Sequence, residues 1–265
     1  MDYGYQLLRH VVQQVFGNLA EAVRLTMALF LAPFLALILL GFGTVMSGGV
    51  PDPAAAGATA LGALFVLAFA ALAYCWAAVG WHRYVLLEEM GNGIVPTFRG
   101  RRIWSYFGRT FLVALTVILA VIGGGLVVAL LLGLTQSPAV AVVMGIGLVF
   151  GASWIATRVG LVLPAAAIGE RMTLRESWNA TRPVSGQILL PLIVIALVVG
   201  LVGQVILLLF GQSESVEFMG EMQEQVVLSL PGQVLNGFVT WLQLLVNLAL
   251  MTTLYGNLIE GRALN

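Results

Sequence analysis

Side chains that could do chemistry are few in this sequence and widely spaced. The two histidines, His10 and His82, are far apart, and the single cysteine, Cys75, lies inside an apolar run. A zinc site needs three or four ligands, and neither His-x-x-x-His nor Cys-x-x-Cys spacing occurs. There is also no glycine-rich phosphate loop and no nucleophile elbow. We therefore expect no metal, no cofactor and no catalytic residues, and we assign His82 to an interfacial aromatic belt with Trp81 and Tyr84.

A stripe of uncharged polar residues follows the last apolar stretch at spacings of four, three and four, and the preceding stretch adds one more. The set is Gln204, Asn236, Thr240, Gln243 and Asn247. Such residues can line a hydrated cavity for a substrate, or they can form interhelical hydrogen bonds worth about 0.6 kcal/mol each. Since no Asp, Glu or Lys lies at the centre of an apolar stretch, proton or ion coupling lacks its usual carrier. We favour the packing role.

The basic residues offer a different chemistry, which is contact with anionic lipid. All 12 are arginines, and several stand beside tryptophan in short segments, as in helices that lie among headgroups. The candidate lipid or partner contacts are Arg101, Arg102, Trp104, Arg109, Arg158, Arg171, Arg175 and Trp178. We expect Arg158, at the end of an apolar stretch, to snorkel to the cytoplasmic headgroups and to pair with Glu88, Glu170 or Glu176.

The composition of the chain indicates the environment in which these side chains lie. The chain has 265 residues, of which 60% are hydrophobic and 9% are charged, whereas soluble domains carry roughly 25% charged residues. This is the composition of an integral membrane protein with a single transmembrane domain. The net charge of zero argues against nucleic acid as a partner.

Six apolar stretches are long enough to cross a hydrocarbon core of about 30 Å. They cover residues 22–46, 58–80, 110–134, 139–163, 188–211 and 231–256. Arginines occur in or beside the two long links, 81–109 and 164–187, and near both ends of the chain, while the other three links have none. The positive-inside rule therefore places both termini and the two long links in the cytoplasm.

The spans also suggest an internal repeat. A short amphipathic segment precedes each span that enters from the cytoplasm: residues 1–21, "FRGRRIWSYFGR" and "TLRESWNATR", the last with Thr173 and Glu176 as a capping box. The sequence thus predicts an all-α membrane protein in which six transmembrane helices form three pseudo-repeated hairpins, each preceded by a short amphipathic interfacial helix.

The segment "RVGLVLPAAAIGERMTLRESWNATRPVSGQ", residues 158–187, resembles a family of bacterial six-helix integral membrane proteins. These are similar to the membrane domain attached to some glycerophosphodiester phosphodiesterases. The resemblance implies a six-helix fold and a role in the membrane. It carries over no enzymatic activity, because no soluble segment of this chain is long enough to be the phosphodiesterase domain.

Together these features favour a non-enzymatic inner-membrane protein that acts by contact. It would be an accessory, scaffold or assembly component of a larger membrane complex, or a lipid-organising protein that grips anionic headgroups. The alternative is a transporter or flippase for a lipid-like or apolar substrate, with the polar stripe lining its path.

Overall fold

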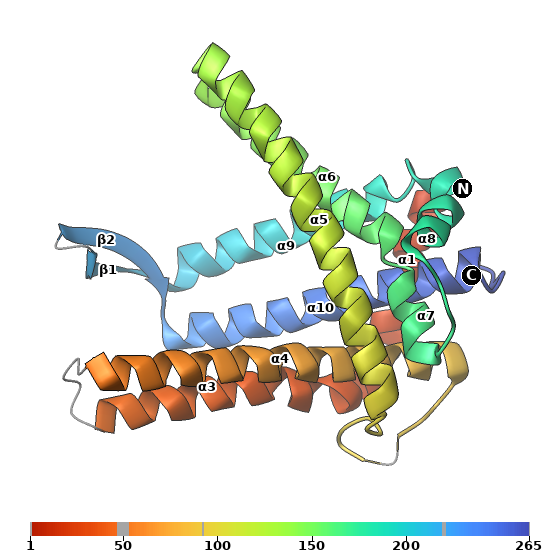
Figure 1. Ribbon diagram of the computed structural model, residues 1–265, viewed down its shortest axis with the longest axis horizontal. Helices are drawn as coiled ribbons and strands as arrows, with labels where there is room; N and C mark the ends of the chain where they lie inside the picture. The colour runs from red at the N-terminus through yellow and green to blue at the C-terminus, as the bar shows by residue number, and fades with distance from the viewer. Residues whose placement is uncertain (1, 47–52, 92, 219–220, 265) are drawn as a thin grey trace.

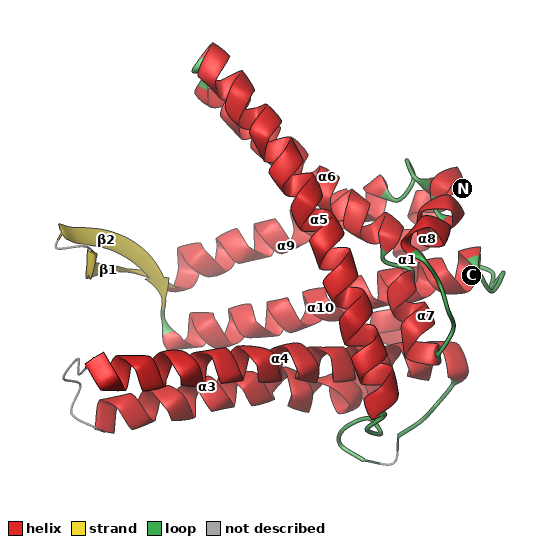
Figure 2. Ribbon diagram, in the orientation of Figure 1, coloured by secondary structure: helices red, strands yellow, loops and turns green. Residues whose placement is uncertain are grey.

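The computed structural model describes residues 2–46, 53–91, 93–218 and 221–264, which are mostly helical (Figures 1 and 2). The helices are α1 Tyr3–Gly17, α2 Leu19–Ala22, α3 Ala28–Met46, α4 Pro53–Leu87, α5 Gly100–Thr135, α6 Pro138–Val159, α7 Val162–Ile168, α8 Leu174–Ala180, α9 Leu189–Phe210 and α10 Leu230–Leu258. A π-helical turn, Val23–Met27, joins α2 to α3, and a 3-10 turn, Arg182–Val184, follows α8.

Six helical stretches are long and apolar enough to cross a membrane, as the sequence predicts: Leu19–Ala36, Ala60–Leu87, Gly100–Thr135, Pro138–Ile168, Leu189–Phe210 and Leu230–Leu258. The chain is therefore a multi-pass membrane protein by the length and composition of its helices. Several helices exceed the predicted spans. For example, α4 begins at Pro53 and ends at Leu87, outside residues 58–80 at both ends.

The fold is not purely helical, because the predicted link 212–225 forms a β-hairpin (Figure 2). Strands β1 (Gly211–Phe218) and β2 (Glu221–Leu228) pair antiparallel, with Gly211 opposite Leu228. The physical reason is local. The sequence "SESVEF" and its partner "QEQVVL" place β-branched residues among polar ones without a 3.6-residue apolar stripe, so an extended pair forms between α9 and α10.

The helices divide into two groups that share one end. Helices α3, α4, α9 and α10 run alongside one another, with α4 contacting both α3 and α10, whereas the α5–α6 hairpin leans away from them (Figure 1). The most apolar stretches of α5 and α6, which are fully described, bury no residue against the rest of the molecule. Both termini, α1, α7 and α8 lie at the shared end.

The core is concentrated at this shared end. Trp81 of α4 and Trp241 of α10 are fully buried. Helix α1 packs on α9 and α10 through Leu7, Val11 and Val15, which are also fully buried. Other apolar residues of α1, Tyr5, Val12 and Phe16, are exposed, so this helix also presents apolar side chains on its outer side.

The second predicted amphipathic segment is not a separate helix. Residues 100–109 continue without a break into the rest of α5, which is 36 residues long. At 1.5 Å per residue this helix spans roughly 54 Å, well beyond an apolar core of about 30 Å. Its first turns, which carry three arginines, therefore extend past the apolar layer.

Candidate functional site

Arginines from two segments surround one pocket at the shared end of the helices. Its walls are Arg101, Arg102, Ser105 and Arg109 of α5 together with Gly169, Glu170 and Arg171 of the turn after α7, and its volume is about 230 Å³. We call this the arginine pocket. It contains four of the predicted contact residues, although Arg171 is 62 or more positions from the others in sequence.

Local backbone geometry holds the pocket together. Gly169 ends α7 in the left-handed conformation with φ of 101°. A Cβ at this position would overlap the guanidinium of Arg102, so only glycine combines this turn with this contact. On the other side, Nη1 of Arg109 donates to the carbonyl oxygen of Met172 at 2.5 Å. The pocket is thus shaped by contacts between α5 and the α7–α8 link.

The pocket is strongly electropositive. Four guanidinium groups face one carboxylate, that of Glu170, and among the described residues no ion pair joins Glu170 to an arginine. The pocket also lies at the N-terminal end of α5, where the helix dipole adds positive potential and the first turn has no acidic residue. An anion with several oxygens, such as a phosphate group, matches the forked donors of arginine.

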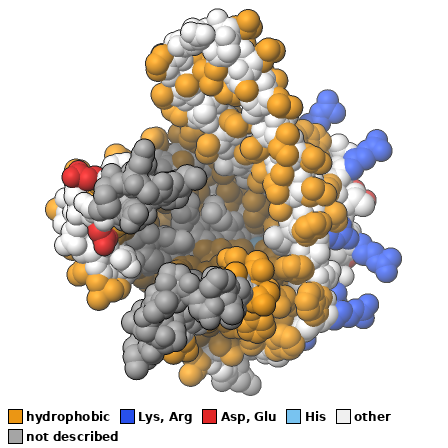
Figure 3. Space-filling model, turned by 60° about the vertical axis from the view of Figure 1, so that its left-hand side comes forward, with side chains coloured by type: hydrophobic (Ala, Val, Ile, Leu, Met, Phe, Trp, Pro, Cys, Tyr) orange, Lys and Arg blue, Asp and Glu red, His pale blue; other side chains and the backbone are white. Residues whose placement is uncertain are grey.

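Three other predicted contact residues lie outside the arginine pocket but remain at the surface or near it. Trp104 is 60% exposed and packs edge-to-face on Phe107. Arg175, on α8, is exposed. Trp178 packs against Trp154 with ring centroids 5.6 Å apart. Charged side chains gather toward the ends of the molecule, with apolar surface between (Figure 3).

Arg158 is held by aromatic rings and not by a carboxylate. Its guanidinium lies 4.9 Å from the ring centroid of Trp154 and 3.6 Å from that of Trp178. Its Nη2 donates to the carbonyl oxygen of Trp178 at 2.7 Å, and its Nε donates to Oγ1 of Thr181 at 3.2 Å. The side chain is 5% exposed, so it is buried between α6 and α8 and does not snorkel to an open surface.

The predicted ion pair of Arg158 is therefore wrong. No carboxylate among the described residues, including Glu88, Glu170 and Glu176, lies within ion-pair distance of it. Cation–π contact, one carbonyl oxygen and one hydroxyl oxygen compensate for the buried charge instead. Glu176 has another role, since it accepts from the Thr173 amide at 2.7 Å and completes the predicted capping box, which is confirmed.

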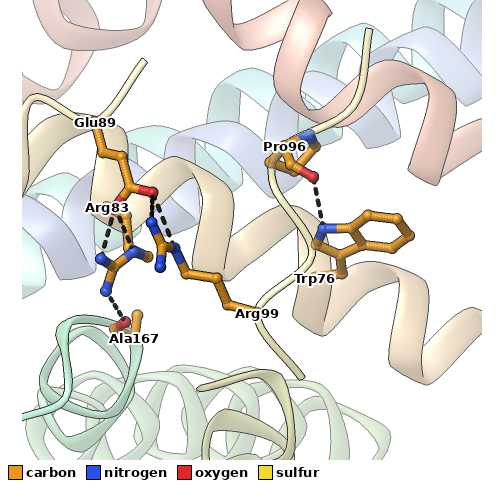
Figure 4. Close-up of polar contacts among 6 residues, drawn as sticks. All are labelled: Trp76, Arg83, Glu89, Pro96, Arg99 and Ala167. Atoms are coloured by element: carbon orange, nitrogen blue, oxygen red, sulfur yellow. Dashed lines mark hydrogen bonds and ion pairs between the residues drawn. The ribbon is translucent and has the colours of Figure 1, made fainter. Parts of the chain in front are cut away.

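A second arginine cluster, which sequence reasoning missed, fixes the segment between α4 and α5 (Figure 4). Glu89 binds Arg83 of α4 and Arg99 beside α5, and Arg83 also donates to the carbonyl oxygen of Ala167 at 3.1 Å. Burial by itself would raise the pKa of Glu89, but hydrogen bonds from both arginines and their charges outweigh it and lower this pKa below its ordinary value. This cluster ties α4, α5 and α7 together next to the arginine pocket.

His82 does not belong to an interfacial belt, contrary to the prediction. It is fully buried, and its ring lies between α5 and α10. Nδ1 is 2.7 Å from Oγ1 of Thr252, and Nε2 is 3.3 Å from the hydroxyl of Tyr106. The belt was expected because aromatic residues flank His82 in the sequence, but its partners are 24 and 170 positions away.

The polar stripe divides between a cleft and the outer surface. Gln243 and Asn247 line a cleft of about 360 Å³ formed by α5, α6, α7, α9 and α10, in which Ser153 and Thr157 of α6 also take part. The remaining stripe residues, Gln204, Asn236 and Thr240, are exposed outside it. Within the described part of the chain, no hydrogen bond joins a stripe side chain to another helix; Thr240 bonds to its own helix at Asn236. The packing role that we favoured thus finds no support in the hydrogen bonds.

The chain matches no family model, no curated protein and no solved structure. The resemblance of residues 158–187 to the bacterial six-helix family therefore stays a prediction. Within the described residues, no group of three or more His, Cys, Asp or Glu side chains is arranged to hold a metal ion.

Proposed function

We propose that this protein is a non-enzymatic, lipid-organising protein of a bacterial inner membrane, with both termini in the cytoplasm. It binds the headgroups of anionic lipids in the arginine pocket. The observation that carries the proposal is the convergence of Arg101, Arg102, Arg109 and Arg171 on one pocket of about 230 Å³. The positive charges of four arginines around one pocket repel one another, and a bound anion would offset this repulsion.

The depth of the pocket supports a lipid headgroup as the anion. The pocket arginines of α5 lie in its first ten residues, and this helix is longer than the apolar core by roughly 24 Å. The pocket therefore sits at headgroup level at the end where both termini lie. Exposed Trp104, on the same segment of α5, suits the interfacial region in which tryptophan is enriched.

Native mass spectrometry of the purified chain in mild detergent tests the proposal. We expect phosphatidylglycerol to remain bound and phosphatidylcholine to dissociate. The double variant Arg102→Gln/Arg109→Gln should weaken phosphatidylglycerol binding by about a hundredfold or more, since each charge-assisted hydrogen bond contributes about 1.5–3 kcal/mol. Arg182→Gln is the matched control, because Arg182 is exposed and lies outside the pocket. Equal loss in the control, or equal retention of both lipids, would contradict the proposal.

The unburied surfaces of α5 and α6 favour a place in a larger membrane complex as a further part of this role. A partner helix would cover surface that otherwise contacts lipid. Purification in mild detergent followed by identification of co-purifying proteins tests this part. A monodisperse monomer free of partner and lipid would count against both scaffold and lipid-organising roles.

A second candidate function, transport or flipping of a lipid-like substrate, is favoured by the cleft that contains Gln243 and Asn247. Under this alternative, Gln243→Leu or Asn247→Leu abolishes lipid movement between the leaflets of proteoliposomes while the protein stays folded. Unchanged movement in both variants would leave the lipid-organising role as the better description.

A further inference from the structure

We propose that the cleft between the α5–α6 hairpin and the α9–α10 pair binds a neutral lipid that carries a free hydroxyl and a carbonyl, of the diacylglycerol type. The cleft is separate from the arginine pocket, and no residue lines both. The inference therefore stands independently of the anionic headgroup site. It rests on three features of the cleft: its lack of charge, the direction of its hydroxyl protons, and its two amides without protein partners.

The cleft has several polar groups among apolar walls, but no charged group. Its walls are apolar residues such as Val149, Phe150 and Leu192, and its polar groups are those of Tyr106, Ser153, Thr157, Gln243 and Asn247. No Asp, Glu, Lys, Arg or His is among the residues that line it. A phosphate moved here from water would lose its hydration without gaining a cation, which is strongly unfavourable. The cleft thus selects a neutral amphiphile.

The hydroxyl groups around the cleft have already used their protons. Oγ of Ser153 donates to the carbonyl oxygen of Val149 at 2.9 Å, and Oγ1 of Thr157 donates to that of Ser153 at 2.9 Å. Both bonds are internal to α6. Each hydroxyl carries one proton, so toward a ligand these two groups present only lone pairs.

The Tyr106 hydroxyl has also donated its proton, in this case to His82. Thr252 gives its proton to the carbonyl oxygen of Leu248 at 2.6 Å, so at 2.7 Å it must accept from the Nδ1–H of His82. This assigns the lone pair of the His82 ring to Nε2, which accepts the proton of the Tyr106 hydroxyl at 3.3 Å. The Tyr106 oxygen is left as an acceptor. Toward a ligand, the hydroxyl oxygens of these three lining residues can therefore act only as acceptors, which favours a ligand that donates.

The amides supply the complementary donors. Gln243 and Asn247 lie one turn apart within the apolar span Leu230–Leu258, and neither side chain bonds to another described residue. Each amide carries two N–H donors and one carbonyl acceptor, and leaving them unpaired in an apolar layer is costly. A ligand carbonyl, such as an ester, would accept from them while its hydroxyl donates to the cleft oxygens.

The position of the cleft also suits a lipid. The α5–α6 hairpin diverges from α9 and α10 (Figure 1), and Val149 of the cleft lining is exposed while most other lining residues are half-buried. Acyl chains could extend from the polar groups along apolar side chains of α6 and α9, including Phe150 and Ile195. The resulting arrangement buries a small polar headgroup and leaves the chains beside the bilayer.

Photolabelling of the full chain tests this inference. The protein is placed in phosphatidylcholine vesicles that contain a few per cent of a diacylglycerol with a diazirine in one acyl chain, and labelled peptides are mapped. We expect label on α6, α9 or α10 at cleft residues. Unlabelled diacylglycerol should compete, whereas its methyl ether and phosphatidylglycerol should not, because one lacks the donor and the other carries a charge.

Variants distinguish binding in the cleft from binding in the arginine pocket. Gln243→Leu/Asn247→Leu should reduce labelling by about thirtyfold, the effect of losing two neutral hydrogen bonds of about 1 kcal/mol each. Gln204→Leu, an exposed glutamine on α9, is the matched control, and Arg102→Gln/Arg109→Gln should leave labelling unchanged. Equal competition by the methyl ether, or equal labelling of the wild type and the cleft variants, overturns the inference. The competition experiment uses the wild-type protein, so it remains decisive even if the double leucine variant fails to fold.

Discussion

The environment of Arg158 shows how this protein keeps a charged residue inside a helical junction. The guanidinium lies against two tryptophan rings that meet edge-to-face, and the Trp178 carbonyl and the Thr181 hydroxyl accept two of its hydrogen bonds. The backbone of the same residue is bound as well, since Oγ of Ser177 donates to the Arg158 carbonyl oxygen at 2.7 Å. Arg158 therefore joins α6 to α8 and so positions the link that carries Arg171.

Substitutions at Arg158 should reduce the free energy of unfolding by more when more of these contacts are lost. We expect Arg158→Ala to cost about 3 kcal/mol, because cation–π contact and two charge-assisted hydrogen bonds disappear together. Arg158→Lys should cost about half as much, since the charge remains but the planar fork is lost. Thermal unfolding in detergent measures both, with exposed Arg182→Lys as the control. A lysine variant as stable as the wild type would contradict the geometric account.

At the scale of elements, α5 and α6 form a hairpin whose contact differs from the one the glycine spacing suggests. Gly147 and Gly151 have the four-residue spacing typical of close helix packing, yet nothing lies within 4 Å of where their Cβ atoms would be. The close approach is at Gly124, where a Cβ would be 2.6 Å from Cδ1 of Leu148. One glycine of the triplet at 123–125 thus packs against α6.

This difference between neighbouring glycines gives a matched test. Gly124→Val should displace the Leu148 side chain and destabilise the protein by about 1 kcal/mol, the lower end of the usual effect of overpacking. Gly123→Val adds the same side chain at a position with open space and should be close to neutral. Thermal unfolding of the two variants checks the expectation. Similar losses in both would mean that helix propensity, and not the contact with Leu148, decides the effect.

For the whole molecule, the distribution of charge agrees with the arrangement of the helices. Both termini, α8 and the arginine pocket lie at one end, and the β-hairpin lies at the other (Figure 1). The hairpin carries exposed Glu214 and Glu224. By the positive-inside rule we expect the arginine-rich end to face the cytoplasm, as the proposed function requires.

Cysteine labelling can test this orientation directly. We expect Ser213→Cys, on exposed β1, to react with an impermeant maleimide added to bacterial spheroplasts. Asn179→Cys, exposed on α8, should react only after the membrane is permeabilised. The wild type provides the blank, because its single cysteine, Cys75, is buried. The reverse pattern would place the arginine pocket outside the cell.

The sequence by itself determined the membrane-spanning character and the six helices, because crossing an apolar layer demands about 20 consecutive apolar residues that composition reveals. It also predicted the Thr173–Glu176 capping box, since a cap depends on residues three positions apart. Only the tertiary structure decided that four arginines share a pocket, that Arg158 binds tryptophans and not a carboxylate, and that His82 meets a residue 170 positions away. Hydropathy reports the medium around a residue, whereas the packing angles of the helices decide its neighbours.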